Sequence, residues 1–295
     1  MPAIEIHNLT KVFTGKKRAS LVALQELDLS IEKGEVFGFL GPNGAGKSTT
    51  INILTGQLRA TSGAARIFGI SVASPSARTN IGYLPENPAF YHFMTAREYL
   101  RFVGRTFRMS PQEIDRETER VLTLLDLTAA ADRPIKGFSK GMTQRLGLAQ
   151  ALVHGPDLYI LDEPMSGLDP IGRALAKDII VSLKKEGKTV FFSTHITADV
   201  EAVCDRVGII VKGQLRALDE VENIMRGTES YLLEIRSPHG DLERKIVGKE
   251  QLSTIILQAI RQESTIERIE PKRKSLEKFF LETVNNSDAT SGPAL

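Results

Sequence analysis

The chain has 295 residues, 38 basic against 36 acidic side chains, and a single cysteine. The basic and acidic charges nearly cancel, so the protein has no strong overall electrostatic attraction to nucleic acid or anionic lipid. We therefore expect no nucleic-acid partner. The lone Cys204 excludes an internal disulfide and a multi-cysteine metal site, which is typical of a reducing compartment.

The N-terminal stretch MPAIEIHNLT lacks the basic start and apolar core of a secretory signal. Apolar runs such as VFGFL are short beside the roughly 20 residues that a membrane-spanning helix needs. We therefore expect a cytoplasmic protein. If it works at a membrane, another chain must anchor it there.

The first strands are expected in the segments AIEIHNL, LDLSI and VFGFL, with turns at TGKKRAS and EKGE between them. A glycine-rich stretch, GPNGAGKSTT, follows the third strand and leads into INILTG, which is typical of the opening of a helix.

Residues 87–155 carry helical patterns and no clear strand. Within them, Thr95 and Glu98 have the spacing of a capping box, in which two polar side chains satisfy the free N–H groups at a helix start. We expect an inserted helical subdomain here.

Short apolar runs return in YILD, TVFFST and RVGIIV, which are typical of parallel strands buried on both faces. The helix expected over residues 171–187 places Ile171, Leu175, Ile179 and Leu183 on one apolar face and ends at Gly187. Strands that alternate with helices predict a doubly wound α/β core.

Beyond about residue 220 the composition becomes more charged. We expect a strand at YLLEIRS, helices at LSTIILQAIRQ and SLEKFFLETV, and a polar, disordered tail.

The stretch GPNGAGKST matches the phosphate-loop pattern G-x-x-x-x-G-K-[ST], between a predicted strand and a predicted helix. Its glycines let successive N–H groups point at phosphate oxygens, while Lys47 would contact the β and γ phosphates and Ser48 would bind Mg²⁺. The alternative is a glycine-rich turn without a ligand.

The strand LYILDE ends in two adjacent acids, Asp162 and Glu163. Neighbouring residues on a strand point to opposite sides, so the two carboxylates can do different work. In phosphate-loop proteins an acid in this position holds Mg²⁺, which suits Asp162, and Glu163 is then the candidate general base. The alternative is that both acids simply face water.

The order GPNGAGKST, IGYLPE, FSKGM, LYILDE, SGLD and FFSTHI, over roughly residues 4–220, resembles the ATP-binding cassette (ABC) ATPases. The resemblance implies an α/β phosphate-loop NTPase core with an N-terminal antiparallel β subdomain and an inserted helical subdomain, here followed by a small C-terminal α+β extension. It also implies ATP and Mg²⁺ as ligands and a homodimer in which each ATP lies between two subunits.

On this resemblance we expect an ATPase domain over residues 1–220, with its helical subdomain at about 87–155. A C-terminal accessory region would cover 221–285 and a disordered tail 286–295. The expected phosphate-contacting residues are Gly41, Pro42, Asn43, Gly44, Ala45, Gly46, Lys47, Ser48 and Thr49.

The signature segment FSKGM retains Ser139 and Gly141 of the common LSGGQ pattern, but Lys140 and Met142 replace Gly and Gln. Ser139 is also a plausible helix cap, and its hydroxyl and the N–H groups after it would face a γ-phosphate across the dimer interface.

Three further residues are assigned by the resemblance. His195 matches the switch histidine that hydrogen-bonds the γ-phosphate, and Asp169 matches the loop that couples the two sites. Phe13 lies where the family often stacks an aromatic ring on adenine. Their alternatives are a structural histidine, a turn residue before Pro170 and a core phenylalanine.

Glu86 in IGYLPE stands where the family usually has Gln, which contacts Mg²⁺ or the attacking water. A carboxylate supplies the same oxygen ligand but adds negative charge near Asp162 and Glu163. Our hypothesis is that Glu86 changes the metal dependence without acting as the base.

The resemblance favours an ATP-hydrolysing subunit that energises export through separate membrane permease subunits, as a peripheral protein on the cytoplasmic side of the cell membrane. The segment NPAFYHFMTAREYL would form the groove for the permease, unless its aromatic residues are subdomain core. The alternatives are a soluble ABC ATPase acting on ribosomes or DNA, and a phosphate-loop kinase or GTPase, which would lack the signature.

Overall fold

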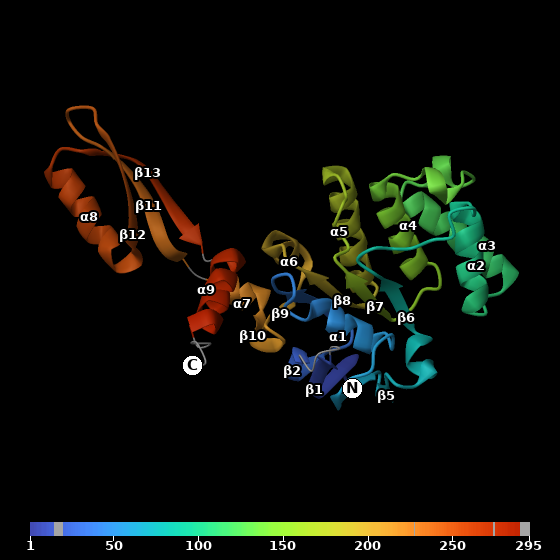
Figure 1. Ribbon diagram of the computed structural model, residues 1–295. Helices are drawn as coiled ribbons and strands as arrows, with labels where there is room; N and C mark the ends of the chain where they lie inside the picture. Colours follow the sequence, from blue (N-terminus) through green and yellow to red (C-terminus); the bar gives the residue numbers. More distant parts are fainter. Residues whose placement is uncertain (15–19, 227, 274, 290–295) are drawn as a thin grey trace.

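The computed structural model describes residues 1–14, 20–226, 228–273 and 275–289. Three sheets and the helices around them form the described part (Figure 1). The predicted turn at TGKKRAS falls mostly on residues 15–19, outside the described residues.

The central sheet is six-stranded, in the order β10-β9-β3-β8-β7-β6. Its strands are β3 (Val36–Leu40), β6 (Ile81–Leu84), β7 (Leu158–Asp162), β8 (Thr189–Thr194), β9 (Arg206–Val211) and β10 (Gln214–Glu220). All pairs are parallel except β9 with β10. The predicted strands at YILD, TVFFST and RVGIIV are confirmed, and their carboxyl ends meet at one edge, where ligands bind in such sheets.

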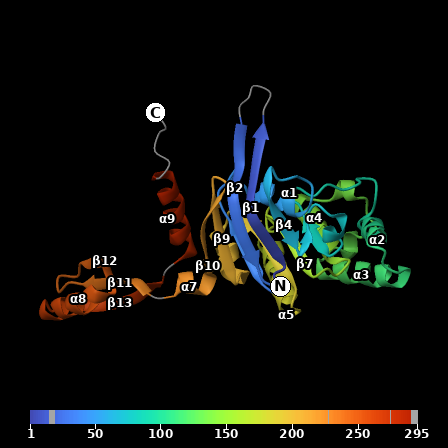
Figure 2. The ribbon, with the colours of Figure 1, turned by 90° about the horizontal axis from the view of Figure 1, so that it is seen from below.

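An antiparallel sheet in the order β2-β1-β4-β5 lies beside the central one. Its strands are β1 (Ile4–Thr14), β2 (Ser20–Ile31), β4 (Ser62–Ile67) and β5 (Ile70–Ser71). Figure 2 shows β1 and β2 extending together beyond the core. Apolar side chains of both sheets and of α1 (Lys47–Leu54) form one buried cluster, which includes Ile6, Leu29, Phe39 and Ile51. This cluster fixes α1 against the end of β3.

The helix α5 (Pro170–Lys185) was expected to bury a face that runs from Ile171 to Leu183. Leu183 is buried, but Ile171 is 80% exposed. Positions four apart drift by about 40° per step at 3.6 residues per turn, so residues 171 and 183 end about 120° apart. The buried face runs instead through Gly172, Ala176, Ile179, Ile180 and Leu183.

Residues 87–155 are helical, as predicted, with α2 (Ala96–Thr106), α3 (Pro111–Leu124) and α4 (Lys140–Leu152). The predicted capping box is confirmed, because the Thr95 hydroxyl accepts from the Glu98 N–H at 3.1 Å and the Thr95 N–H donates to the Glu98 carboxylate at 2.9 Å. Ser110 and Glu113 form a second box at the start of α3.

His154 links this helical region to the central sheet. Its ring stacks on Phe107 with centroids 3.6 Å apart, and its Nε2 lies 3.1 Å from the carbonyl oxygen of Ile81. Burial lowers the pKa of His154 from 6.5 to about 4. The imidazole therefore stays neutral in the folded protein over the range in which it would charge in the unfolded chain.

This difference predicts a loss of stability in acid. Between pH 6.5 and 4 the unfolded chain binds a proton at His154 that the folded chain does not, so the free energy of unfolding falls as the pH falls, by about 2 kcal/mol at pH 5. His154→Gln keeps a donor for the Ile81 carbonyl and should lose less stability between pH 7 and 5 in thermal unfolding. The same change at exposed His7 is the control, and equal acid losses in all three proteins would contradict the prediction.

The C-terminal part forms a separate small sheet, in the order β12-β11-β13. Its elements are α7 (Val221–Met225), β11 (Thr228–Arg236), β12 (Leu242–Gly248), α8 (Lys249–Arg261), β13 (Thr265–Arg273) and α9 (Leu276–Ala289). One face of the sheet packs on α8 through Leu233, Ile235, Val247 and Ala259. Figures 1 and 2 show this unit standing away from the core while α9 returns to it.

The helix α9 packs against α6 (Thr197–Val203), α7 and the edge of the central sheet. Leu276 is fully buried, and its N–H donates to the Glu201 carboxylate at 2.8 Å. Disorder was expected from residue 286, but α9 continues to Ala289. The Ser287 hydroxyl, buried in the fold, donates to the Thr283 carbonyl at 2.7 Å and so satisfies a polar group inside the helix. Residues 290–295 lie outside the described residues.

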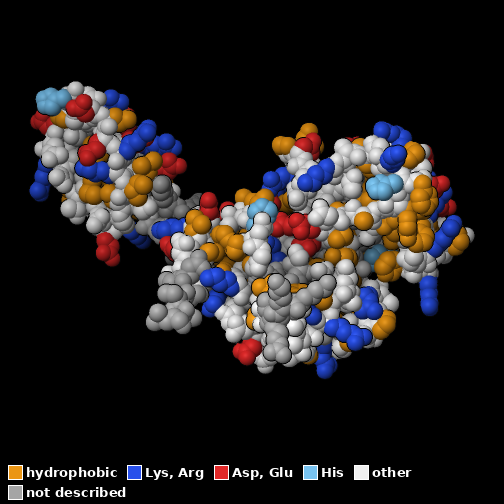
Figure 3. Space-filling view, in the orientation of Figure 1, with side chains coloured by type: hydrophobic (Ala, Val, Ile, Leu, Met, Phe, Trp, Pro, Cys, Tyr) orange, Lys and Arg blue, Asp and Glu red, His pale blue; other side chains and the backbone are white. Residues whose placement is uncertain are grey.

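Hydrophobic side chains gather on the surface of the helical region (Figure 3). Of the aromatic segment singled out in the sequence, Phe93 is 81% and Tyr91 54% exposed, whereas Phe90 and Met94 pack against the core. Phe102 of α2, 42% exposed, packs its ring edge-on to Tyr91. No helix of the described part of the chain is both long and apolar enough to span a membrane.

Candidate active site

The glycine-rich loop joins the end of β3 to the start of α1. Gly44 and Gly46 have φ values of 77° and 112°, in the left-handed region that favours glycine. A Cβ on Gly46 would lie 2.7 Å from the carbonyl oxygen of Ala23, so glycine is also required by the close approach of β2. The loop thus brings its N–H groups together at the amino end of α1, where the helix dipole favours an anion.

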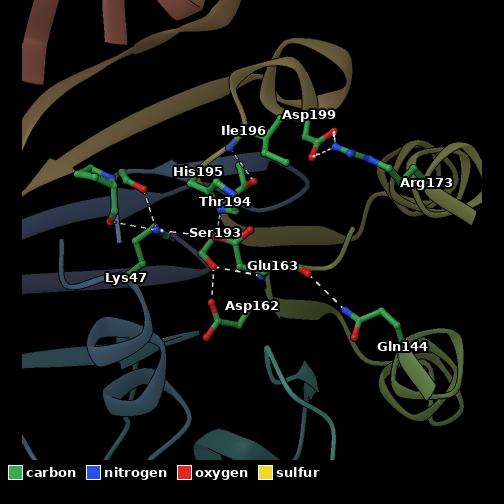
Figure 4. A network of polar contacts seen from close by, with 12 residues as sticks. Lys47, Gln144, Asp162, Glu163, Arg173, Ser193, Thr194, His195, Ile196 and Asp199 are labelled. Atoms are coloured by element: carbon green, nitrogen blue, oxygen red, sulfur yellow. Dashed lines mark hydrogen bonds and ion pairs between the residues drawn. The ribbon is translucent and has the colours of Figure 1, made fainter. Parts of the chain in front are cut away.

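Lys47 is the first residue of α1 and only 7% of its surface is exposed. Its ammonium group donates to the carbonyls of Gly41 at 2.7 Å and Pro42 at 3.3 Å, and lies 3.8 Å from Oε1 of Glu163 (Figure 4). Burial lowers the pKa of Lys47, and the nearby Glu163, Asp162 and Glu86 carboxylates oppose that shift. A buried ammonium surrounded by acceptors is suited to a multiply charged anion.

Asp162 and Glu163 lie where β7 ends, and both are almost fully buried. The Ser193 hydroxyl of β8 donates to Oδ1 of Asp162. The Glu163 N–H points to the carbonyl and hydroxyl oxygens of Ser193, at 3.2 and 3.3 Å. Glu163 has a φ of 49°, a left-handed conformation that costs a non-glycine residue about 1–3 kcal/mol. The two acids therefore occupy a strained strand end whose backbone is tied to β8.

His195 directly follows β8, and its Nδ1 lies 2.9 Å from Oε1 of Glu163. An ionised carboxylate only accepts hydrogen bonds, so Nδ1 carries the proton when Glu163 is charged. The Thr194 hydroxyl accepts from the Ile196 N–H at 3.1 Å and shapes the turn after the histidine. Lys47, Glu163 and His195 are thereby brought into one cluster by three different strand ends.

A pocket of about 400 Å³ opens in front of this cluster. It is lined by Phe13, Leu21, Val22, Ala23, residues 43–49, Glu86 and Glu163. Phe13 is 40% exposed and lies under the Lys11 ammonium group, 5.0 Å from the ring centroid, so the core alternative for this residue is wrong. An apolar wall on one side and a polar loop on the other suit a ligand with a flat ring and phosphates.

The other predicted site residues do not line this pocket: Gly41, Pro42, Asp162 and His195 lie behind or beside it, in the loop and strand ends described above, and Ser139, Gly141 and Asp169 belong to other helix starts. Ser139 caps α4 as predicted, because its hydroxyl accepts from the Met142 N–H at 3.2 Å. Asp169 caps α5 and accepts from the Gly172 N–H at 2.8 Å. A Cβ on Gly141 would lie 3.8 Å from the carbonyl oxygen of Gly167, so the signature segment lies beside the SGLD loop.

The predicted metal ligands are oxygen donors. Ser48, Asp162 and Glu86 supply hydroxyl and carboxylate oxygens, which Mg²⁺ prefers. Among the described residues, no group of three or more His, Cys, Asp and Glu side chains is placed to hold a metal ion. The oxygens present fit a cation that takes the rest of its ligands from phosphates and water.

Comparisons with known proteins agree with this geometry. Residues 24–166 match the family model described as ABC transporter. The chain is 44% identical over 214 residues to the ABC transporter ATP-binding protein sll0415 of Synechocystis, covering 71% of this chain and 60% of that relative. It is 38% identical to the ABC transporter ATP-binding protein YxlF of Bacillus subtilis, over 89% of this chain and 95% of YxlF.

The chain belongs to the ABC transporter ATP-binding protein family. Its fold agrees with the dimeric structure of MJ0796, a bacterial ABC transporter cassette, with a TM-score of 0.69 and 25% identity. The likeness covers 74% of this chain and 98% of that cassette. The expected fold class, a phosphate-loop NTPase core with added subdomains, is confirmed.

An ion pair with a buried carboxylate connects two helices of this ABC cassette, α5 and α6. Asp199 of α6 is 2% exposed and accepts from Arg173 of α5 through both oxygens at 3.0 Å, with the Lys177 ammonium group 3.2 Å away. Since α5 begins at the Asp169 cap and α6 follows His195, the pair holds these two segments in a fixed relation (Figure 4).

Sequence reasoning missed several residues of the site. Ser193 lies next to Asp162 because β7 and β8 pair with these two residues opposite each other, and the sequence alone does not give that register. Leu21 and Val22 are exposed apolar residues near the tip of β2 whose place in the pocket depends on the pairing of β1 with β2. Gln144 contacts the carbonyl of Glu163 across 19 positions of sequence, and no local pattern indicates that contact.

Proposed function

We propose that this chain binds and hydrolyses ATP and thereby energises transport through separate membrane subunits. The observation that carries the proposal is the convergence of Lys47, Asp162, Glu163 and His195 beside the glycine-rich loop. Each group suits one requirement of γ-phosphate transfer to water. The Lys47 ammonium suits the phosphates and the Asp162 carboxylate suits the metal. Glu163 suits the general base, and His195 suits a hydrogen bond to the γ-phosphate.

In the proposed reaction, residues 41–49 bind the phosphates and Lys47 exchanges its carbonyl partners for phosphate oxygens. The Glu163 carboxylate takes the proton of the attacking water. His195 would hydrogen-bond the γ-phosphate through Nε2, while Nδ1 stays with Glu163. Ser48, Asp162 and Glu86 would hold Mg²⁺, which neutralises phosphate charge when bound.

The proposal includes a homodimer with composite sites. Ser139, Gly141 and Asp169 do not line the pocket of their own subunit, and in this proposal they act at the ATP of a second copy. The dimeric structure of the MJ0796 cassette supports this arrangement. The Ser139 hydroxyl and the N–H groups at the start of α4 would then face a γ-phosphate.

The names of the relatives support a membrane permease as the further partner and a peripheral position on the cytoplasmic side of the membrane. The exposed aromatic residues Tyr91, Phe93 and Phe102 are proposed as the docking patch. Export is the proposed direction of transport, on the resemblance of GYLPE, the signature and the C-terminal helix to the exporter branch.

Release of inorganic phosphate from ATP by the purified chain tests the proposal. We expect Mg²⁺-dependent release that is saturable in ATP and rises when the cognate permease is present in lipid vesicles. No release in either preparation would contradict it.

Glu86 allows a more specific test of the metal site. Its side chain is exposed and lines the pocket. Within the described part of the chain, Glu86 forms no ion pair. Glu86→Gln removes one charged oxygen, so we expect half-maximal ATPase activity to require about 3- to 10-fold more Mg²⁺. The exposed Glu250→Gln of α8 is the control. Unchanged Mg²⁺ dependence and turnover would refute the role.

A further inference from the structure

The amide of Gln144 joins the signature helix to the backbone of the proposed base. Gln144 lies in the second turn of α4 and is 4% exposed. Its Nε2 donates to the carbonyl of Glu163 at 3.3 Å (Figure 4). It also donates to the carbonyl of Pro164 at 3.3 Å. A buried side-chain amide that serves two carbonyls of one turn fixes the path of the chain there.

The chain at this turn needs such support. The left-handed φ of 49° at Glu163 is one that non-glycine residues keep only where surrounding contacts enforce it. The N–H of Glu163 donates to Ser193. The carbonyl of Glu163 also accepts from the Ser166 N–H at 3.0 Å. Gln144 adds a side-chain contact to the backbone of this turn, and it comes from a helix and not from the sheet or the turn itself.

The direction of the Glu163 side chain follows from this backbone conformation. The carboxylate lies 2.9 Å from Nδ1 of His195 and 3.8 Å from the Lys47 ammonium group. A change of φ at this residue would swing the carboxylate away from both. Positioning errors of about 1 Å can reduce a chemical step by about 100-fold.

We propose that Gln144 is a positioning residue that holds Glu163 in its productive conformation and couples it to the signature helix. The proposal rests on the proposed function, in which Glu163 is the base and Ser139 meets the ATP of the partner subunit. Ser139 and Gln144 lie on the same end of α4, about one and a half turns apart. A shift of α4 on contact with one nucleotide would therefore reach the base of the other site through a single side chain.

The first test is Gln144→Glu, which keeps the size of the side chain and replaces an amide donor with a carboxyl group. An ionised carboxylate cannot donate, so it would face two carbonyl oxygens without a hydrogen bond. Burial raises the pKa of a carboxyl group, and its protonated form donates to one carbonyl. We expect kcat to fall about 10- to 100-fold at pH 8 and to recover partly, relative to wild type, at pH 6.

Gln144→Met removes the donor at every pH and serves as a second variant. We expect a similarly low kcat without recovery at pH 6, while the dissociation constant for ATP, measured by calorimetry, stays within about twofold of wild type. Gln150→Glu is the matched control, because Gln150 lies on the same helix, accepts from the Tyr99 hydroxyl at 2.6 Å and donates to the Tyr83 carbonyl at 3.5 Å. The change therefore also removes an amide donor that faces a carbonyl, but at a place away from the Glu163 turn.

Three results would overturn the inference: normal kcat in both Gln144 variants, an equal fall in Gln150→Glu, or a loss that does not depend on pH in Gln144→Glu. Two other measurements separate a failure of the proposed function from a failure of this inference. The proposed function fails if the wild-type chain releases no phosphate from ATP, and the role of Glu163 as the base fails if Glu163→Gln hydrolyses ATP normally. If it is inactive while the Gln144 variants are normal, only the coupling fails.

Discussion

Lys47→Ala is expected to weaken ATP binding about 10- to 100-fold and to reduce hydrolysis about 1,000-fold. Charge-assisted hydrogen bonds to phosphate are the strongest polar contacts that the loop can offer, and Lys47 is buried where they would form. Binding is measured by calorimetry and hydrolysis by phosphate release.

The matched control is Lys33→Ala, since Lys33 is exposed in the turn before β3 and away from the pocket. It should bind and hydrolyse ATP as the wild type does. Folding is checked by thermal unfolding, because Lys47→Ala also removes the cation beside Glu163. A correctly folded Lys47→Ala chain with normal ATP affinity would show that the loop does not bind the phosphates.

Glu163→Gln is expected to lower kcat about 100- to 10,000-fold while ATP binding is retained. The amide keeps the shape of the side chain, and it cannot take a proton from water. Because hydrolysis would no longer open the proposed dimer, ATP and Mg²⁺ should convert the variant to a stable dimer in size-exclusion chromatography.

Glu35→Gln is the control for the loss of a buried carboxylate. Glu35 is 8% exposed against 7% for Glu163, and it pairs with Arg206 at 3.1 Å near the opposite end of β3. Its replacement should reduce stability and leave kcat unchanged. Normal turnover in Glu163→Gln would exclude Glu163 as the base.

The elements with strong local patterns could be predicted from the sequence. The apolar runs of β3, β7, β8 and β9 are each bounded by a glycine, an acid or a turn, which marks the strands in the sequence. Helical segments lie between these strands, and strands connected through a helix pair in parallel. The phosphate loop, the Thr95 cap and the Ser139 cap were recognised for the same reason, because each depends on residues within a few positions.

Elements whose stability depends on distant partners were not predicted. The sequences of β12 and β13 are LERKIVG and TIERIEPKR. Many of their residues are charged, so the few apolar side chains that face α8 do not give a recognisable strand pattern. The place of α9 on α6 and α7 likewise depends on burial of Leu276 against elements about 75 positions away. Long-range packing of this kind leaves little signal in a local pattern.

The candidate site divides in the same way. Each proposed catalytic side chain belongs to a motif that the sequence shows. The residues that hold these side chains in place belong to no such motif: Ser193 bonds Asp162, Gln144 bonds the backbone of Glu163, and Asp199 of α6 pairs with Arg173 of α5. The left-handed conformation of Glu163 had no sequence signal, because glycine is the residue that usually indicates it.

The most direct test of the account is a crystal structure of Glu163→Gln with ATP and Mg²⁺. We expect phosphates against the N–H groups of residues 44–49 and the Lys47 ammonium group, Mg²⁺ at Ser48, and Ser139 of a second copy at the γ-phosphate. ATP bound elsewhere, with Lys47 still donating to the carbonyls of Gly41 and Pro42, would contradict it.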